Sequence, residues 1–374
     1  MGEGSGESIQ NHVACFMKFL FIVQGEGRGH MTQAISLGEM LRSQGHEVVK
    51  VLVAKSAGRE VPKFFYEKIK APVEHYESPN FVFDSTGKKV NVWISIAFNF
   101  LKIFTYAKSV WKISQQVKES QPDIIINFYD IMGGFYALFF RPQAEMYCMA
   151  HQFLLLHPKF VFPKGFGVDK FLVNLYSRIT AIGSEKRLAL SFKPMADVSD
   201  KKIYVVPPLL RPEVRALTPV KGKFILGYLL NSAYADDIEI WHKDHPKVEL
   251  HLFWDKKDVP EELKVSNNLT FHKINDVKFL DYMSKCGALV TTAGFESVCE
   301  AMYFGKPIMM VPTLGHFEQA CNALDASRVG AGIQNDKFDL STLLEYIPKH
   351  KDISKEFRQW ADSSKDKFLK LLVN

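Results

Sequence analysis

The segment 290–322 constrains the fold more than any other part of the chain. It opens with an apolar run that ends at Gly294, which is typical of a buried strand. A second apolar run covers Pro307–Val311, and a further helical pattern follows it. Between the two runs, apolar residues recur at helical spacing: Phe295, Val298, Cys299, Met302 and Tyr303. This order of elements predicts a parallel α/β unit, and a chain of 374 residues predicts two α/β domains.

The polar residues of this segment suit a nucleotide. The start of a helix presents free N–H groups and a partial positive charge, so it favours a phosphate, and Gly294 lets the phosphate approach the backbone. Ser297 adds a hydroxyl donor, and the Glu300 carboxylate is suited to both hydroxyls of a ribose. Glu318 and Gln319 start the next helix, where they are suited to gripping a sugar. An ordinary βαβ unit with polar surface residues explains each residue singly but not the whole string.

The spacing Gly-Phe-x-Ser-x-x-Glu-Ala-x-x-x-Gly-x-Pro-x-x-x-x-Pro, followed by Glu-Gln-x-x-Asn-Ala, resembles the donor-site signature of GT-B glycosyltransferases. Similar branches are the UDP-glycosyltransferases and the bacterial lipid-linked GlcNAc transferase of peptidoglycan synthesis. The resemblance implies an α/β protein with two Rossmann-like, doubly wound domains that face a cleft. It adds Phe295 to the donor site. It also implies that backbone groups of residues 272–274 contact the uracil base, and Ile274 is the candidate among them. Asn231 follows a predicted strand and is a candidate for a phosphate contact.

Proline and basic residues concentrate after the last strand predicted for the first half, Ile203–Val206, and this marks a linker. The C-terminal residues 354–373 have apolar side chains at helical spacing, and in the GT-B fold such a helix crosses back to the first domain. The expected division is a disordered leader, an acceptor-binding domain, a linker, a nucleotide-sugar-binding domain and a terminal helix: 1–16, 17–210, 211–222, 223–350 and 351–374.

A glycine-rich turn, Gln24–His30, separates the first predicted strand from a helix. Its glycines do not have the spacing of a dinucleotide fingerprint, and no acidic residue closes the second strand, so an NAD site is not expected. In similar glycosyltransferases this turn lies in the cleft, which makes Gly27, Arg28 and Gly29 acceptor-site candidates. His30 lies at a helix start, which favours a neutral imidazole that accepts a proton from a hydroxyl. A histidine that only packs the turn is the alternative.

Two further candidates follow predicted strands. Asp130 comes after the apolar run that starts at Pro122, at the end of a strand where open α/β sheets bind ligands. We expect Asp130 to orient His30, as carboxylates orient catalytic imidazoles. His151 follows the run that starts at Met146, and it is either an acceptor contact or a buried structural histidine.

Composition narrows the partners. The net charge of +6 is mild, and without a tight cluster of lysine, arginine and aromatic residues it argues against nucleic acid. Five scattered cysteines indicate a reducing compartment, so a cytoplasmic location is expected. No apolar run reaches the roughly 20 residues that span a bilayer. The aromatic, lysine-containing stretch 90–117 is either a core helix or a surface for a lipid acceptor or the inner face of a membrane.

The resemblance implies an inverting, metal-independent glycosyltransferase that moves a sugar from a UDP-sugar to a hydroxyl of a lipid, small molecule or glycan. No cofactor is expected beyond the nucleotide sugar, and the chain lacks the Asp-x-Asp pair that holds a divalent ion in the other main glycosyltransferase fold. Two alternatives remain open. One is an isomerase like the UDP-sugar 2-epimerases, which share this architecture; the other is a non-catalytic nucleotide-sugar binding protein.

Overall fold

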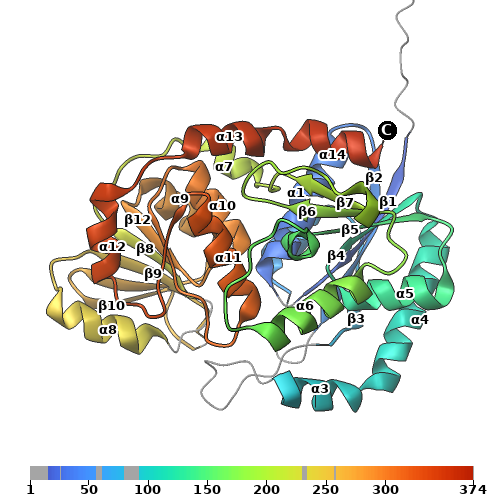
Figure 1. Cartoon of the computed structure of the whole chain (residues 1–374), viewed down its shortest axis with the longest axis horizontal. Helices are drawn as coiled ribbons and strands as arrows, with labels where there is room; N and C mark the ends of the chain where they lie inside the picture. The colour runs from blue at the N-terminus through green and yellow to red at the C-terminus, as the bar shows by residue number, and fades with distance from the viewer. Residues whose placement is uncertain are drawn as a thin grey trace, which may run out of the picture.

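A computed structural model describes residues 16–25, 27–55, 61–79, 92–229, 234–256 and 258–373. The chain folds into two parallel-dominated sheets, each with helices on both faces, and the two halves lie side by side (Figure 1). This is the α/β architecture with two doubly wound domains that the sequence predicts. The expected linker, 211–222, falls between the last strand of the first sheet and the first strand of the second.

The N-terminal sheet is parallel throughout, with the strand order β3-β2-β1-β4-β5-β6-β7. Its centre is the uninterrupted apolar strand β1, in which Phe19–Val23 have no exposed surface. A strand covered on both faces needs such a run, because neither side meets water. The strands are β1 (Lys18–Val23), β2 (Glu47–Lys55), β3 (Val73–Glu77), β4 (Ile124–Phe128), β5 (Glu145–Ala150), β6 (Lys186–Leu190) and β7 (Ile203–Val206).

The C-terminal sheet has the order β10-β11-β9-β8-β12-β13-β14 and is parallel except at one edge. There β10 pairs antiparallel with β11 and is largely exposed, so it lacks the apolar pattern that marks the other strands. The strands are β8 (Ile225–Leu229), β9 (Leu250–Trp254), β10 (Glu262–Ser266), β11 (Leu269–Lys273), β12 (Ala288–Thr291), β13 (Ile308–Met310) and β14 (Gly332–Gln334).

Helices connect the strands in both halves. In the first half they are α1 (Arg28–Arg42), α2 (Lys63–Ile69), α3 (Val92–Phe100), α4 (Ile103–Ser120), α5 (Ile131–Phe140) and α6 (Gly167–Thr180). The linker contains α7 (Pro212–Ala216). The second half has α8 (Ala235–Asp244), α9 (Asp276–Lys285), α10 (Phe295–Tyr303), α11 (Phe317–Arg328), α12 (Ser341–Tyr346), α13 (Ser354–Asp362) and α14 (Ser364–Leu372).

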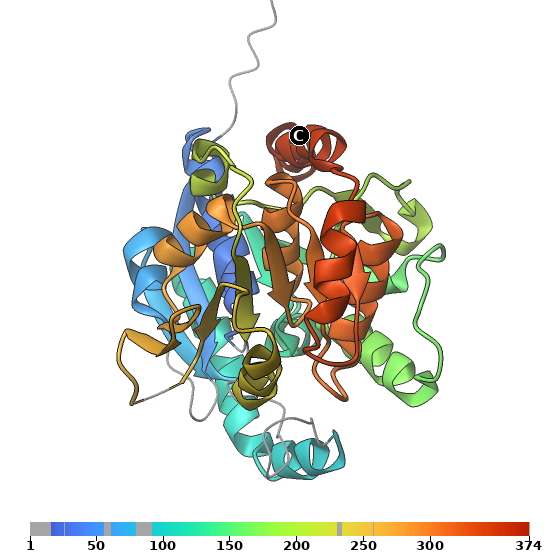
Figure 2. The same cartoon turned by 90° about the vertical axis from the view of Figure 1, so that its left-hand side faces the viewer.

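The C-terminal segment returns to the first half as two helices rather than the single predicted helix. The hydroxyl of Ser363, between them, donates to the Trp360 carbonyl at 2.7 Å, and such a side-chain bond competes with helix continuation. Trp360 Nε1 donates to the carbonyl of Ser191 at 2.9 Å, which ties α13 to the N-terminal half. Figure 1 shows α13 and α14, in red, along the top of the molecule, and Figure 2 shows the red end of the chain at the top, seen nearly end-on.

The topology brings two helix starts to the same cleft. The chain order reverses beside β1, which lies between β2 and β4, and beside β8, which lies between β9 and β12. Open α/β sheets bind ligands at the carboxyl ends of strands at such reversals. Helix α1 follows β1 and helix α10 follows β12, so the glycine-rich turn and the 294–297 segment face one another across the two halves.

Candidate active site

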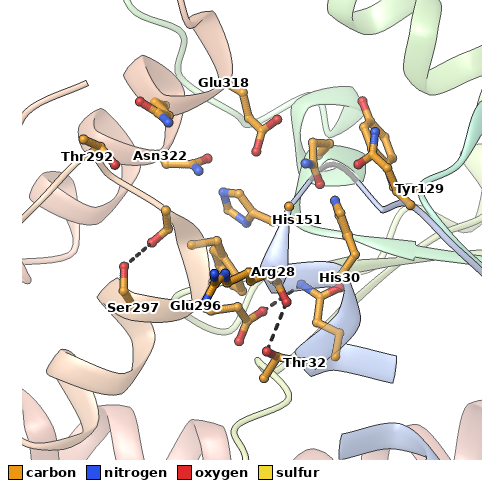
Figure 3. A pocket seen from close by; sticks show the side chains of 18 of the residues that line it. Arg28, His30, Thr32, Tyr129, His151, Thr292, Glu296, Ser297, Glu318 and Asn322 are labelled. Atoms are coloured by element: carbon orange, nitrogen blue, oxygen red, sulfur yellow. Dashed lines mark hydrogen bonds between the residues drawn. The ribbon is translucent and has the colours of Figure 1, made fainter. Parts of the chain in front are cut away.

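A cavity of about 570 Å³ lies between the halves and is lined by residues from both. Figure 3 shows its polar side chains converging from α1, α10, α11 and the ends of β4 and β5. Twelve of the fourteen predicted site residues line it. These are Gly27, Arg28, Gly29, His30, His151, Ile274, Gly294, Phe295, Ser297, Glu300, Glu318 and Gln319. Asn231 lies outside the described residues, and Asp130 does not line the cavity.

The start of α10 is open to the cavity. Its N-cap, Gly294, makes no side-chain capping bond, so the N–H groups of the first turn are not satisfied by a capping side chain. The Ser297 hydroxyl donates to the Gly294 carbonyl at 3.1 Å. Ala293, just before, has a φ of 61°, an uncommon value for a residue with a side chain. Sparsely populated backbone conformations cluster at functional sites, and this one lies directly before the N-cap of α10.

Glu300, predicted to hold a ribose, is already paired with an arginine. Arg211 Nε and Nη2 donate to its two carboxylate oxygens at 2.6 and 3.0 Å. Although burial lowers the pKa of Arg211, the charge and hydrogen bonds of Glu300 outweigh this effect and raise it. A ribose at Glu300 therefore has to share the carboxylate with a buried guanidinium, which sequence spacing did not indicate.

A second ionic contact joins the halves beside this pair. Lys68 Nζ, on α2, lies 2.8 Å from Glu213 and 3.0 Å from Asp276, at the start of α9. Arg211 Nη1 donates to the Asp276 carbonyl at 3.2 Å. These contacts fix the linker against the first turn of α9, next to Ile274 on the cavity wall.

The start of α11 contributes the remaining donor-site candidates. Gln319 is buried, and its side-chain oxygen accepts the Thr313 N–H at 2.8 Å, so the glutamine holds the loop before the helix. Asn322, one turn on, donates to the Ala293 carbonyl at 3.1 Å and steadies the approach to α10. Glu318 projects into the cavity opposite His30 and His151 (Figure 3).

Glu296 joins the two halves at the mouth of α10, and the sequence did not single it out. Gln33 Nε2, on α1, donates to Glu296 Oε1 at 2.7 Å. Burial raises the pKa of Glu296 to about 8. A Cβ on Gly29 would lie 3.4 Å from Glu296 Cγ, so the glycine-rich turn abuts the helix start. The nearest sequence signal is the spacing of Gln33, one helical turn after His30.

His30 lies in the first turn of α1, buried in the cavity wall. Its ring stacks on Tyr129 at 5.9 Å between centroids. Burial lowers its pKa, opposed by the charge of Glu318 and by the Gln33 side chain, so the imidazole is neutral near pH 7. Among the described residues its Nδ1 has no hydrogen-bond partner. Tyr129 itself has a φ of 62°, the counterpart of Ala293 after the other central strand.

Asp130 does not orient His30 in this structure. It is the N-cap of α5: one carboxylate oxygen accepts the Met132 N–H at 2.9 Å and the Ser78 hydroxyl at 3.2 Å. Asp130 has no exposed surface and lies behind the cavity wall. The intervening Tyr129 takes the position facing the imidazole, and the carboxylate whose charge acts on His30 is Glu318.

His151 presents a lone pair to the cavity. Its Nδ1 lies 2.7 Å from the Leu190 carbonyl, and because a carbonyl only accepts, Nδ1 carries the proton. Burial lowers the pKa of His151, against smaller opposing effects from Asp325, Leu190 and Glu318. The ring stacks on Phe295 at 4.2 Å, and Nε2 has no partner among the described residues. A neutral imidazole with a free Nε2 accepts a hydrogen bond from a hydroxyl.

Within the described ranges, no cluster of three or more histidine, cysteine, aspartate and glutamate side chains has the geometry to hold a metal ion. The described helices include none with the length and apolar character needed to cross a bilayer. The four cysteines in these ranges are buried free thiols: Cys148, Cys286, Cys299 and Cys321.

Comparison with known families agrees with this geometry. The model of glycosyl transferase family 1 matches residues 17–349. The chain belongs to this family. An uncharacterized glycosyltransferase of Methanosarcina acetivorans is 21% identical over 348 residues, covering 84% of this chain and 85% of the relative. The family therefore spans both halves and the cleft, and the chain is a glycosyltransferase.

Solved structures of glycosyltransferases share the fold. The glycotransferase of kitacinnamycin has a TM-score of 0.61 at 14% identity, over 95% of this chain and 98% of its own. Phytolacca americana UGT2, solved with UDP-2fluoro-glucose and pterostilbene, has 0.61 at 13%, over 94% and 95%. MurG of Acinetobacter baumannii has 0.55 at 14%, over 95% and 99%. At these identities the likeness establishes the GT-B fold alone.

Proposed function

We propose that this glycosyltransferase transfers a sugar from a UDP-sugar to an acceptor hydroxyl with inversion, without a metal ion or any cofactor beyond the nucleotide sugar. One observation carries the proposal: a single cavity joins the uncapped start of α10 to the buried, neutral imidazole of His30. The start of α10 is suited to binding the diphosphate of a donor, and the His30 imidazole is suited to accepting the proton of an acceptor hydroxyl.

On the donor side, the diphosphate binds at Gly294–Ser297, where N–H groups and the Ser297 hydroxyl stabilise its growing negative charge. The uracil lies beside Ile274, the ribose reaches Glu300, and Glu318 with Gln319 contacts the sugar. Asn231 is the proposed further phosphate contact. Losing one donor at such a site costs on the order of 3 kcal/mol of transition-state stabilisation.

On the acceptor side, His30 takes the proton of the attacking hydroxyl. The hydroxyl oxygen forms the new bond to the anomeric carbon on the face opposite the diphosphate, and the bond from that carbon to the diphosphate oxygen breaks. UDP leaves with both electrons of that bond. Gly27, Arg28 and Gly29 border the acceptor, and the Nε2 lone pair of His151 accepts a hydrogen bond from one of its hydroxyls.

Gly294→Ala tests the donor site directly. A Cβ at Gly294 would meet only Ser297 Oγ at 3.6 Å, and its φ of −68° suits alanine, so the variant should fold. The methyl group would stand where the phosphate approaches the backbone. Calorimetric titration with UDP, dTDP and GDP should give the tightest binding for UDP and a loss of at least tenfold in the variant.

Gly167→Ala is the matched control, since it also places a methyl group at a helix start, with no other atom within 4 Å. UDP binding equal in wild type and Gly294→Ala would refute the donor site. Incubation with UDP-sugar alone addresses the isomerase alternative, because an epimerase would release an altered UDP-sugar without any acceptor.

Peripheral contact with the inner face of a membrane fits the surface formed by α3 and the start of α4. Helix α4 buries Tyr106, Val110 and Ile113 against the first half, as a core helix does. Its other face and the preceding turn expose apolar side chains: Phe100, Leu101, Ile103, Phe104 and Trp111. With Lys102 and Lys108 among them, this surface suits an anionic bilayer. Phe100→Ser with Phe104→Ser should reduce sedimentation with phosphatidylserine vesicles.

A further inference from the structure

Helix α6 buries the wrong residues for a helix that only supports the fold. Its fully buried residues are Ser177 and Thr180. Val173, Tyr176 and Ile179 are partly buried against the core, whereas the apolar residues nearer its start are more exposed. Val168 and Phe171 are 66% and 64% exposed. An amphipathic helix normally turns its apolar face to the core, so an apolar face left open beside a cavity indicates a ligand.

The apolar residues form one continuous stripe. Leu172, Leu175 and Ile179 follow one another by three and four residues and line the cavity. Val168 and Phe171 continue the same face one turn earlier, outside the cavity. At 1.5 Å per residue the stripe from Val168 to Ile179 is roughly 16 Å long. It therefore leads from solvent to the interior of the site.

The inner end of the stripe adjoins the proposed base. Tyr129, on which His30 stacks, shares a 2.7 Å hydrogen bond with the Ser177 hydroxyl of α6. Tyr129 also packs against Tyr176 at 5.4 Å between ring centroids. A hydroxyl held at His30 is thus next to the apolar wall that α6 provides.

The outer end opens beside aromatic side chains from both halves. Phe162 and Phe166, just before α6, pack on Phe317 at the start of α11, at 6.2 and 5.3 Å between ring centroids. Lys170 Nζ lies 4.1 Å from the centre of the Phe162 ring. This end of α6 thus combines apolar side chains with the charged residues Lys170 and Asp169, of which Asp169 lines the cavity.

We propose that the acceptor is an amphiphile whose hydroxyl head reaches His30 and whose alkyl or prenyl tail lies along α6 from Ile179 to Val168. This inference rests on the proposed function, because it takes the attacking hydroxyl to be at His30. Polar head groups match the imidazoles at the bottom of the cavity, and an apolar tail covers the stripe that the protein leaves uncovered.

Alkyl glucosides of increasing tail length test the proposal on the full chain. Calorimetry with ethyl, hexyl and decyl β-glucoside, below their micelle concentrations, should show tighter binding with each longer tail, up to about fourfold per methylene. Phe171→Ser combined with Leu175→Ser should weaken decyl glucoside at least tenfold and leave ethyl glucoside within twofold. Ile240→Ser, which changes an equally exposed residue of α8, should behave as wild type.

UDP titration of the same samples separates the two proposals. If UDP binds but the affinity for glucosides does not depend on tail length, the amphiphile proposal is overturned and the donor site stands. The same holds if the α6 variant retains the dependence on tail length. A compact fused-ring alcohol that binds as tightly as decyl glucoside in both wild type and the α6 variant also overturns it. The effect of Gly294→Ala on UDP binding does not depend on the acceptor tail, so a failure of the donor-site proposal is recognised separately.

Discussion

Helices α10 and α6 border the same cavity and are built in opposite ways. Helix α10 buries its apolar residues, among them Val298, Cys299 and Met302, and turns a polar start to the cleft. Helix α6 buries two hydroxyl side chains and leaves the apolar residues Val168, Phe171 and Leu175 exposed. Two polar side chains near α10 are paired within the protein, Glu300 with Arg211 and Gln319 with the Thr313 N–H.

This difference indicates two kinds of recognition in one cleft. A side built from paired polar groups and a fixed helix start is rigid, which suits a ligand of constant shape such as a nucleotide diphosphate. An open apolar stripe has no directional demands, so it suits ligands that vary in length. The strongest test of the contrast is at the junction of the two sides, where His30 lies.

His30→Ala should lower kcat by 10²- to 10⁴-fold, the usual range for loss of a general base. UDP affinity should change less than twofold, because the donor side is intact. In the wild type, burial lowers the pKa of His30 from its usual value of 6.5, so the imidazole stays neutral at pH 6.5 and somewhat below. The acid limb of kcat/KM should therefore fall below pH 6.5.

His75→Ala provides the control, since His75 is a half-buried histidine on β3 outside the cavity. The kcat of sugar transfer should be the same in His75→Ala as in the wild type. If His30→Ala retained its kcat, the base would have to be sought elsewhere, and His151 would be the next candidate.

Glu300→Ala should raise the donor KM more than other donor-side changes, and it should also destabilise the fold. Removing one partner of a buried ion pair typically costs about 3–5 kcal/mol. Urea unfolding of Glu300→Ala, Arg211→Met and the double variant measures this. If the pair is mainly structural, the double variant should be more stable than Glu300→Ala. A donor KM that rises only in the variants without Glu300 would assign the carboxylate to the ribose.

Glu296→Gln should flatten the pH dependence of stability between pH 4.5 and 8. The unfolded chain loses this proton near 4.5, whereas the folded protein keeps it until about 8. The folded state binds more protons in this window, so wild-type stability falls as pH rises. The variant should gain on the order of 1–2 kcal/mol at pH 8, because Glu296 keeps some contact with cavity solvent. Thermal unfolding with an unchanged slope would place the titration on another group.

EDTA should have the smallest effect, leaving both UDP affinity and transfer rate unchanged. The proposed diphosphate site uses backbone N–H groups where other enzymes use a cation. A loss of activity restored by Mg²⁺ or Mn²⁺ would show that the α10 start is not sufficient by itself.

The sequence predicted the fold, and most of its candidate donor-site residues line one cavity, for a local reason. Buried strands such as β1 and the helical spacing of 295–303 are set by short-range periodicity, and polar residues that follow parallel strands meet at one edge of the sheet. The family match confirms the identification as a glycosyltransferase. Ile274, taken from resemblance alone, also lines the cavity.

The parts that the sequence did not predict depend on long-range geometry. Gln33 and Glu296 are 263 residues apart, and Arg211 reaches Glu300 across 89 residues, so no local pattern marks either contact. The position of Asp130 at the end of a predicted strand led us to pair it with His30, but the left-handed backbone at Tyr129 turns the chain and leaves Asp130 to cap α5. Helix α6 was missed because its apolar spacing alone does not reveal what it faces.

The return of the chain end to the first half determines how the cleft is able to open. The halves are joined covalently twice, once before β8 and once between α12 and α14, and Arg215 in the first connection forms an ion pair with Asp362 in the second at 3.0 Å. A body held at two neighbouring points swings about the line through them and resists twisting about other axes. We therefore expect any opening of the cleft to be a hinge motion about this line. Helix α10, which is tied to the linker through Glu300 and Arg211, should then stay close to the pivot.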